Sequence, residues 1–368
     1  MERLTSLDAF RGATVASMIL VNNPGSWDQV YSQLDHSVWD GWTFTDLVFP
    51  SFLWMVGVSM TLSFSKRMTQ EHSRRKLMLH SLRRGGLIFV IALLLNQFPY
   101  FTFDEVRLPG VLQRIAICYV IAAAIYLFGG RRGVVAAVVI LLTGYWMLMM
   151  LYPVPGFGPG VLTRDGNFAK YIDGLVLQGH MWRQTRTWDP EGIVSTLPAI
   201  ATTLFGILTG MFLKTSRSQP EKTAWLFTGS CGLLLTGLVM NIWMPINKNL
   251  WSSSYAVFMA GMSTGIFALF YWLIDVQGQK AWAKPFVIYG QNALAAFVFS
   301  GMLARIMEEI RVPDVGGRSI PLQTWVYRNA LLPMAQPKRA SVLYAVANVA
   351  AVFLFSYVLY RKKWLIRL

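Results

Sequence analysis

Long apolar runs alternate with short polar segments along most of the chain. A helix that crosses a bilayer needs about 20 mostly apolar residues, and ten runs have or approach this length and character. The pattern therefore predicts an all-α fold, a polytopic membrane helical bundle with about ten transmembrane helices. The predicted spans are 8–22, 46–64, 85–98, 109–128, 133–152, 192–213, 224–245, 253–274, 285–304 and 342–360.

The composition agrees with this pattern. Of the 368 residues, 54% are hydrophobic and 14% are charged, whereas a soluble domain carries about 25% charged residues. The apolar runs are thus the bulk of the protein, and we treat 1–368 as a single transmembrane domain. The segment 324–334 is apolar but too short to span, which favours an interfacial or re-entrant piece.

The charged residues predict the orientation. A formal net charge of +15 would suggest a nucleic-acid partner in a soluble protein. Here the positive-inside rule accounts for it, because Lys and Arg collect in loops that stay in the cytoplasm, and we predict no nucleic-acid partner. With both termini in the cytoplasm, the inner segments carry more Lys and Arg than the outer ones. The long loops 153–191 and 305–341 then lie on the extracytoplasmic side.

Asp8 and Arg11 open the first predicted span. They are three residues apart, lie on one helical face and can pair. Two interpretations stay open, since polar groups at membrane depth are costly and need a reason. The pair either anchors the helix at the interface, or Arg11 faces a cavity and binds an anion.

A histidine and two acids gather at the predicted outer mouth of the first two spans. Asn22 ends the first span, and the run His36-Ser-Val-Trp-Asp-Gly-Trp-Thr-Phe-Thr-Asp46 follows. Histidine titrates near neutral pH and acts as a base, an acid or a nucleophile. Asp46 is placed to hold its ring in one tautomer, as the acid of a triad does. A lone loop histidine is more often a plain surface residue, so both interpretations stand at this point.

Further polar residues enter three other spans. Arg107 precedes the fourth span, and Gln113 and Arg114 lie within it; a buried Arg must face protein, water or a ligand, and it suits phosphate or carboxylate. The run Asn247-Lys248-Asn249 precedes the eighth span, where a helix cap is the simpler explanation. Asn292 in the ninth span can bond another helix or a substrate. No Walker loop, dinucleotide fingerprint or zinc motif occurs in the sequence, so we predict no metal site.

Together these motifs resemble the membrane catalytic domain of the heparan-alpha-glucosaminide N-acetyltransferase family and its bacterial relatives. The matching segments keep the family's order from residue 6 to about residue 300. They are 6–12, 21–22, 36–50 with Gly57, 107–114, 189–193 and 247–252. The opening Leu-Asp-x-x-Arg-Gly pattern is also similar to that of a wider group of membrane acyltransferases. The resemblance thus implies a transmembrane acyltransferase-like fold.

The resemblance implies an activity and some of the residues that carry it. The family moves acetyl from cytoplasmic acetyl-CoA to the amine of a terminal glucosamine on the far side of the membrane. His36 matches its active histidine, Asn22 a functional asparagine, and Arg107 the arginine before the Pro-Gly-Val-Leu-Gln-Arg motif. For a bacterial relative, free glucosamine is an acceptor as well, and the inner membrane is the expected location. The resemblance also favours a homodimer.

We therefore expect His36, Asn22 and Asp46 to be catalytic. Acetyl-CoA is the expected co-substrate, with its phosphates at the cytoplasmic mouth and its pantetheine arm running between helices towards His36. The residues predicted to bind it are Arg11, Arg83, Arg84, Arg107, Gln113 and Arg114. The residues predicted to contact the acceptor are Trp39, Asp40, Asn247, Lys248, Asn249 and Asn292.

The sequence leaves two chemical routes and two other functions open. His36 either carries the acetyl group itself or deprotonates the sugar ammonium for direct attack. Asn22 would hydrogen-bond the oxyanion or the acceptor. The alternative functions are an O-acetyltransferase of an envelope glycan and a transporter of sugars or organic acids. The 36–50 run and the lack of visible inverted repeats argue against the transporter.

Overall fold

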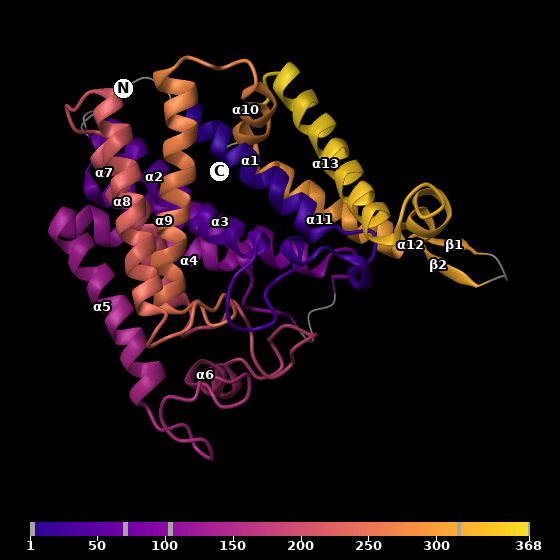
Figure 1. Ribbon diagram of the computed structural model, residues 1–368, viewed down its shortest axis with the longest axis horizontal. Coiled ribbons are helices and arrows are strands. Elements are labelled where there is room, and N and C mark those ends of the chain that lie inside the picture. The colour runs from indigo at the N-terminus through magenta and orange to yellow at the C-terminus, as the bar shows by residue number, and fades with distance from the viewer. Residues whose placement is uncertain (1–3, 69–72, 102–105, 315–317, 367–368) are drawn as a thin grey trace.

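The computed structural model describes residues 4–68, 73–101, 106–314 and 318–366, and helices make up most of it (Figure 1). One small antiparallel hairpin pairs β1 (Arg311–Pro313) with β2 (Ser319–Pro321). The helices are α1 (Thr5–Asn22), α2 (Phe44–Met68), α3 (Arg74–Gln97), α4 (Val111–Ala124), α5 (Gly130–Leu151), α6 (Phe168–Val176), α7 (Thr196–Leu213), α8 (Gln219–Met240), α9 (Ser253–Phe270), α10 (Lys284–Gln291), α11 (Ala293–Glu309), α12 (Leu322–Trp325) and α13 (Pro337–Arg361).

The prediction of an all-α, polytopic membrane protein is confirmed. Each predicted span falls on a helix, and seven helices of the described chain are long and apolar enough to cross a membrane, or eight if the bent pair α10–α11 is one span. This count is lower than the predicted ten for two reasons. The helix α1 is not among the seven, and it carries Asp8 and Arg11. The predicted spans 109–128 and 133–152 both lie in the helical stretch Val111–Leu151, which is counted once.

The stretch Val111–Leu151 is 41 residues long. A straight helix of that length would measure about 60 Å, twice the thickness of the hydrocarbon core. The chain instead turns at Gly130, which has a φ of 57°, so that α4 and α5 run in different directions (Figure 1). Both helices pack against α7. Two crossings joined at Gly130 therefore fit a bilayer better than one.

The centre of the bundle is formed by α2, α7 and α9. In their most apolar windows, 61–67% of the residues are buried, against 22–33% for the windows in α3, α8, α13 and Val111–Leu151. The pair α2–α7 is packed main chain to main chain. A Cβ added at Gly57 would lie 2.0 Å from the carbonyl oxygen of Thr203, and one at Gly206 would lie 1.9 Å from that of Trp54. Glycine at both positions is what allows these helices to touch.

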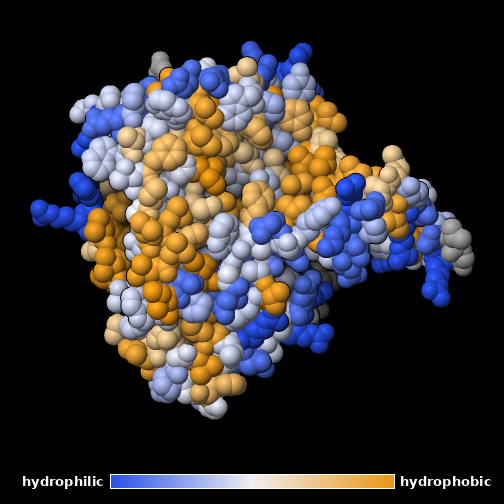
Figure 2. Space-filling model, viewed as in Figure 1, coloured by the Kyte–Doolittle hydropathy of each residue, from blue (hydrophilic) through white to orange (hydrophobic). Residues whose placement is uncertain are grey.

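The outer helices carry the lipid-facing surface. Large apolar side chains are exposed on α5, at Val139 and Ile140, and on α8, at Leu235 and Leu238. Figure 2 shows apolar residues gathered on the left of the molecule, over α5 and α8, with hydrophilic residues along the upper edge. A soluble monomer rarely exposes so much contiguous apolar surface, whereas a spanning helix is apolar on every side.

The two ends of the bundle differ. The N-terminus lies at one end and α6, with the loop around it, lies at the other (Figure 1). Near the N-terminal end, α10 and α11 are bent by 83° relative to each other, and Asn292 sits at the bend. The segment 324–334 falls on α12 and the following π-helical turn Val326–Leu331.

Candidate active site

His36 and Asp46 form a close pair at the start of α2. The His36 Nδ1 lies 2.6 Å from Asp46 Oδ1. The carboxylate is fully buried, whereas the His36 side chain is 44% exposed. His36 stands in the loop between α1 and α2, and Asp46 stands in the first helical turn. The pairing predicted from the sequence is therefore present in the structure.

The Asp46 carboxylate is held by more than the histidine. Its Oδ2 accepts hydrogen bonds from the backbone N–H of Ser37 (3.1 Å) and of Thr43 (3.0 Å), and from the Thr43 hydroxyl (3.1 Å). An aspartate is ionised at neutral pH, and an ionised carboxylate only accepts hydrogen bonds, so His36 Nδ1 donates to it. In the neutral ring this leaves the lone pair on Nε2. The described residues give Nε2 no hydrogen-bond partner.

The segment before α9 fastens the His36 loop to the bundle. The Gly41 N–H donates to the Ile246 carbonyl (2.7 Å), and the Asn247 amide donates to Asp40 Oδ1 (3.1 Å). The Tyr255 hydroxyl donates to the Asp46 carbonyl (2.6 Å). Three residues predicted to contact the acceptor, Asp40, Asn247 and Lys248, therefore lie on two segments that the structure joins beside the His36–Asp46 pair.

The capping interpretation of the polar run before α9 is also confirmed. Ser252 is the N-cap of α9, and its hydroxyl accepts from the Tyr255 N–H at 3.3 Å. The Asn247 side chain accepts from the Leu250 N–H at 2.9 Å. Asn249, another predicted acceptor contact, is half-buried in the same turn. The segment 247–252 thus both caps α9 and attaches the His36 loop to the bundle.

The loop 153–191 reaches the His36 loop at two points. The Trp39 indole N–H donates to the Leu162 carbonyl (3.0 Å), and its ring makes an edge-to-face contact with Trp188, with centroids 5.5 Å apart. Arg164 donates to the Val38 carbonyl (2.6 Å) and lies over the Trp39 ring. The loop is therefore in direct contact with the neighbourhood of the histidine.

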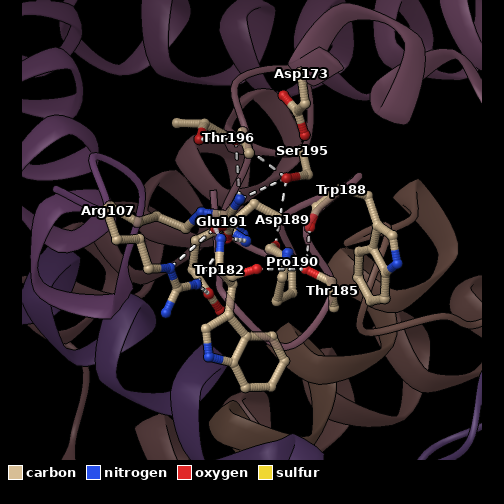
Figure 3. A network of polar contacts seen from close by, with 12 residues as sticks. Arg107, Asp173, Trp182, Thr185, Trp188, Asp189, Pro190, Glu191, Ser195 and Thr196 are labelled. Carbon is tan, nitrogen blue, oxygen red and sulfur yellow. Dashed lines mark hydrogen bonds and ion pairs between the residues drawn. The ribbon is translucent and has the colours of Figure 1, made fainter. Parts of the chain in front are cut away.

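A second polar cluster joins the start of α4 to the start of α7 (Figure 3). Arg107 donates to Asp189 through Nε (2.9 Å) and Nη2 (2.7 Å), and to Glu191 through Nη2 (2.6 Å). Arg114 donates to the Gly192 carbonyl (3.1 Å) and to the Ser195 hydroxyl. We call these residues, Arg107, Arg114, Asp189, Glu191 and Ser195, the arginine cluster.

Burial and charge act against each other in and around the arginine cluster. Burial opposes the charge of Arg107, but Asp189 and Glu191 outweigh it and raise the pKa of the guanidinium. Burial also opposes ionisation of Glu191, but Lys248, Arg107 and Arg114 outweigh it and lower its pKa. For Asp173 on α6, the Ile193 N–H, which donates to its carboxylate at 2.9 Å, and the charge of Arg114 do not outweigh burial. Burial, and to a smaller extent the charge of Asp189, raise its pKa to about 6.

The structure does not bring the residues predicted to bind acetyl-CoA into one site. Arg11 pairs with Asp8 at 3.0 Å, as predicted, and also donates to Ser59 at 2.7 Å. Arg84 lies over the Tyr119 ring, and Arg83 is exposed. No contact among the described residues joins these three to the arginine cluster. Arg107 and Arg114 lie in that cluster, and Gln113 is buried beside Arg114 on α4.

Two other predicted site residues make no polar contact with His36 in the described part of the chain. Asn22 is exposed at the C-terminal end of α1, and no polar contact among the described residues joins it to His36. Asn292 is buried, and its amide binds the C-terminal tail: it donates to the Trp364 carbonyl (3.1 Å) and accepts from the Ile366 N–H (2.9 Å). The structure therefore does not bring Asn292 to the acceptor side, where we predicted it.

The sequence did not indicate the partners of Arg107. Asp189 and Glu191 lie 82 and 84 residues away along the chain, so no spacing signal connects them. The sequence shows the Asp-Pro-Glu-Gly motif at 189–192. It does not show which residues the two acids contact.

Comparison with known proteins identifies the family. The family profile described as "Heparan-alpha-glucosaminide N-acetyltransferase, catalytic" matches residues 3–227, which is more than half of the chain. The chain belongs to this family. The family profile includes the His36–Asp46 pair and the arginine cluster, whereas Lys248 and Asn292 lie beyond the matched range. The resemblance stated from the motifs is thus confirmed.

Two curated relatives agree with the family profile. The chain is 29% identical to the Homo sapiens protein named heparan-alpha-glucosaminide N-acetyltransferase over 351 residues, which is 80% of this chain and 52% of that protein. It is 27% identical to the Mus musculus protein of the same name over 416 aligned positions, 98% of this chain and 60% of that protein. The chain thus spans between half and three fifths of the length of these relatives.

Proposed function

We propose that this chain is a transmembrane N-acetyltransferase. It moves acetyl from cytoplasmic acetyl-CoA to the amine of a terminal or free glucosamine on the extracytoplasmic side. The observation that carries the proposal is the His36–Asp46 pair, in which Asp46 accepts a hydrogen bond from Nδ1–H and leaves Nε2 open. Membership of a family whose curated relatives are named as glucosaminide N-acetyltransferases supports the amine as the acceptor.

Asp46 and His36 have separate roles in this reaction. Asp46 fixes the ring orientation and stabilises the imidazolium when it forms, as the acid of a triad does. His36 Nε2 either removes a proton from the sugar ammonium or attacks the thioester carbonyl and carries the acetyl group. In both routes the same lone pair starts the chemistry, and Asn22 remains a proposed partner of the acceptor.

We propose that the pantetheine arm of acetyl-CoA passes Gln113 and Arg114. The Nε2 of Gln113 and the Nε and Nη1 of Arg114 are buried without a hydrogen-bond partner in the described structure. The arm carries amide carbonyls, which accept hydrogen bonds. Arg83 and Arg84 are exposed and able to meet the phosphates. Arg107 is already bonded to two carboxylates, so we assign it to holding the loop rather than to acetyl-CoA.

The same proposal includes a topology. The chain forms one transmembrane acyltransferase domain in a bacterial inner membrane, with both termini in the cytoplasm. The loops 153–191 and 305–341 then lie outside with the acceptor. The contacts of loop 153–191 with Trp39 and Val38 support an acceptor site at that end. We propose a homodimer as the assembly.

The test is acetyl transfer by purified protein in liposomes. Wild-type protein is supplied with radiolabelled acetyl-CoA and glucosamine, beside His36→Ala and a matched control, His180→Ala. His180 is another outer-side histidine, and its Nδ1 lies 2.8 Å from the Val106 carbonyl. We expect label in the N-acetylated sugar from the wild type and from His180→Ala, and none from His36→Ala.

Other outcomes would redirect the assignment. Transfer that survives in His36→Ala would remove the proposed centre. Labelling of N-acetylglucosamine, which has no free amine, would indicate an O-acetyltransferase. Sugar binding or uptake without any consumption of acetyl-CoA would indicate a transporter.

A further inference from the structure

Lys248 carries an ammonium group that no described residue pairs, at the end of a side chain that is mostly buried. The residue is 9% exposed and lies in the turn between α8 and α9. The described residues offer its side chain no hydrogen bond and no ion pair within 4.0 Å. The ammonium nitrogen is not among the buried atoms that lack a hydrogen-bond partner, so solvent reaches it, and an acceptor oxygen of a bound substrate can take the place of that solvent.

The backbone around Lys248 is fixed beside the His36 loop. The Lys248 carbonyl accepts from the Trp251 N–H at 3.1 Å. The preceding residue, Asn247, donates to Asp40, and Ile246 accepts from Gly41. The position of Lys248 relative to the histidine loop is therefore set by hydrogen bonds on both sides of it.

The ammonium acts on two carboxylates without binding either. Besides the hydrogen bond with His36, the charge of Lys248 acts on Asp46. It is also the charge that contributes most to lowering the pKa of Glu191, ahead of Arg107, which touches that carboxylate. Both carboxylates are occupied, Asp46 by His36 and Glu191 by Arg107. The donors of Lys248 are thus left for a group that binds next to them.

We propose that Lys248 is a further catalytic residue, whose ammonium binds the oxyanion formed on the acetyl carbonyl during transfer. The proposal rests on the proposed function. In the direct route, the amine nitrogen forms a bond to the carbonyl carbon, and the C=O pair moves to oxygen. The pair then returns, the C–S bond breaks, and CoA leaves as the thiolate. His36 Nε2 takes one proton from the sugar ammonium before the attack, and the thiolate takes the second proton, which nitrogen releases when the C–S bond breaks.

The charges at the site explain why a cation is required there. The oxyanion forms next to His36, and therefore close to the ionised Asp46. Like charges at short range oppose each other in a site of low dielectric constant. A fixed cation near the developing charge offsets this and needs no reorganisation during the reaction. If His36 carries the acetyl group instead, each of the two transfers forms the same oxyanion, and the same ammonium serves both.

The test compares Lys248→Met, Lys248→Arg and Lys170→Met in proteoliposomes with acetyl-CoA and glucosamine. Lys170 is a control on α6, within the loop 153–191, and it pairs with the exposed Asp165 at 2.8 Å. We expect kcat of Lys248→Met to fall by about 10²-fold, the size seen when an oxyanion donor is removed. KM for both substrates should stay within about threefold of the wild type. Lys248→Arg should recover at least about tenfold of the loss, and Lys170→Met should match the wild type.

A second measurement separates charge from structure. In Lys248→Ala, added propylammonium should restore part of kcat, whereas 1-propanol, which has a similar shape and no charge, should not. If Lys248→Met does not fold, this rescue and the Lys248→Arg rate decide the question.

The outcomes are distinct. A wild-type rate in Lys248→Met overturns the proposal, and so does a raised KM for glucosamine at unchanged kcat, which would make Lys248 a sugar contact. Lys248→Met and Lys248→Ala can also both be inactive. The proposal is then overturned if propylammonium does not rescue Lys248→Ala and the rate of Lys248→Arg is as low as that of Lys248→Met. If the wild type transfers no acetyl to any amino sugar, the proposed function itself fails, and the role of Lys248 falls with it.

Discussion

The His36–Asp46 pair and the arginine cluster are built from similar contacts but are completed differently. Each sets nitrogen donors against buried carboxylates at 2.6–2.9 Å. The histidine is 44% exposed and keeps one ring nitrogen open, whereas Arg107 is 24% exposed and is bonded to two acids. An open nitrogen can take part in a reaction, whereas Arg107, which is bonded to two acids, holds segments together. This difference separates a candidate reaction centre from a structural joint.

Sequence distance follows the same division. His36 and Asp46 lie ten residues apart, and the loop and first turn of one helix bring them together. Arg107 and Asp189 lie 82 residues apart, so their contact exists only when α4 and the start of α7 have packed. The pair depends on local folding, and the cluster depends on the assembled bundle.

The largest expected effect is that of Asp46→Asn on the rate. An amide cannot hold the Nδ1–H tautomer as a carboxylate does, so we expect kcat to fall by about 10³-fold. The measurement is acetyl transfer at saturating acetyl-CoA. Glu221→Gln is the control, because Glu221 lies at the start of α8 and pairs with the exposed Arg217, not with the histidine. A full rate in Asp46→Asn would mean that the pair is not the reaction centre.

Arg107→Met should act on stability instead. Removal of the guanidinium leaves Asp189 and Glu191 buried and uncompensated, which costs about 3–5 kcal/mol. The measurement is the apparent melting temperature in detergent, and a second substitution, Asp189→Asn, should recover part of the loss. Arg217→Met is the control, since it breaks an exposed pair with Glu221 and should change little. An unchanged melting temperature in Arg107→Met would contradict a structural role for the cluster.

Asp173 predicts a pH dependence of stability. Its pKa is raised from 3.8 to about 6 in the folded protein, so the folded state favours the protonated acid. The resulting stability is complete below pH 3.8 and is lost as pH rises through 6, by up to about 3 kcal/mol. The melting temperatures of wild type and Asp173→Asn should therefore be similar near pH 4. Towards pH 7 the melting temperature of the variant should rise relative to that of the wild type.

Asp165→Asn should change stability with pH in the opposite direction to Asp173→Asn, and it serves as the control. Lys170 lowers the pKa of Asp165, so this variant should lose slightly relative to the wild type as pH rises. If Asp173→Asn shows the same sign as Asp165→Asn, Asp173 does not carry the strain of a buried acid.

The smallest expected effect is that of Trp188→Ala. Its edge-to-face contact with Trp39 is worth about 1 kcal/mol, and it connects loop 153–191 to the histidine loop. We expect kcat/KM for glucosamine to fall about fivefold, with little change for acetyl-CoA. Trp188→Phe, which keeps a ring, should lose less. Equal losses for both sugar and acetyl-CoA would point to general unfolding of the loop.

The features that the sequence predicted correctly depend on local spacing. The apolar runs predicted the helices, although the third helix, α3, begins at Arg74, before the predicted span 85–98. The three-residue spacing of Asp8 and Arg11 gave their ion pair. The acid–histidine pair followed from the density of polar groups between two spans. Each signal is contained within one element or one turn.

The features that the sequence did not predict depend on packing between distant segments. The tail contact of Asn292 joins residues 72 and 74 positions apart, and it lies at the 83° bend between α10 and α11. A polar residue in an apolar run indicates that a partner exists, but not which one. For this reason the sequence could not choose between a substrate and another part of the chain as the partner of Asn292. In the structure its amide binds the chain's own backbone.

The contact between α2 and α7 restricts how this protein can change over evolutionary time. The atoms that face Gly57 and Gly206 are main-chain carbonyl oxygens, which every amino acid possesses. A methyl group gained on one helix therefore cannot be accommodated by a smaller side chain opposite, because there is no side chain opposite to shrink. Lineages that lose either glycine would have to shift a whole helix, and α2 also carries Asp46. The two glycines and the acid are thus expected to be inherited together.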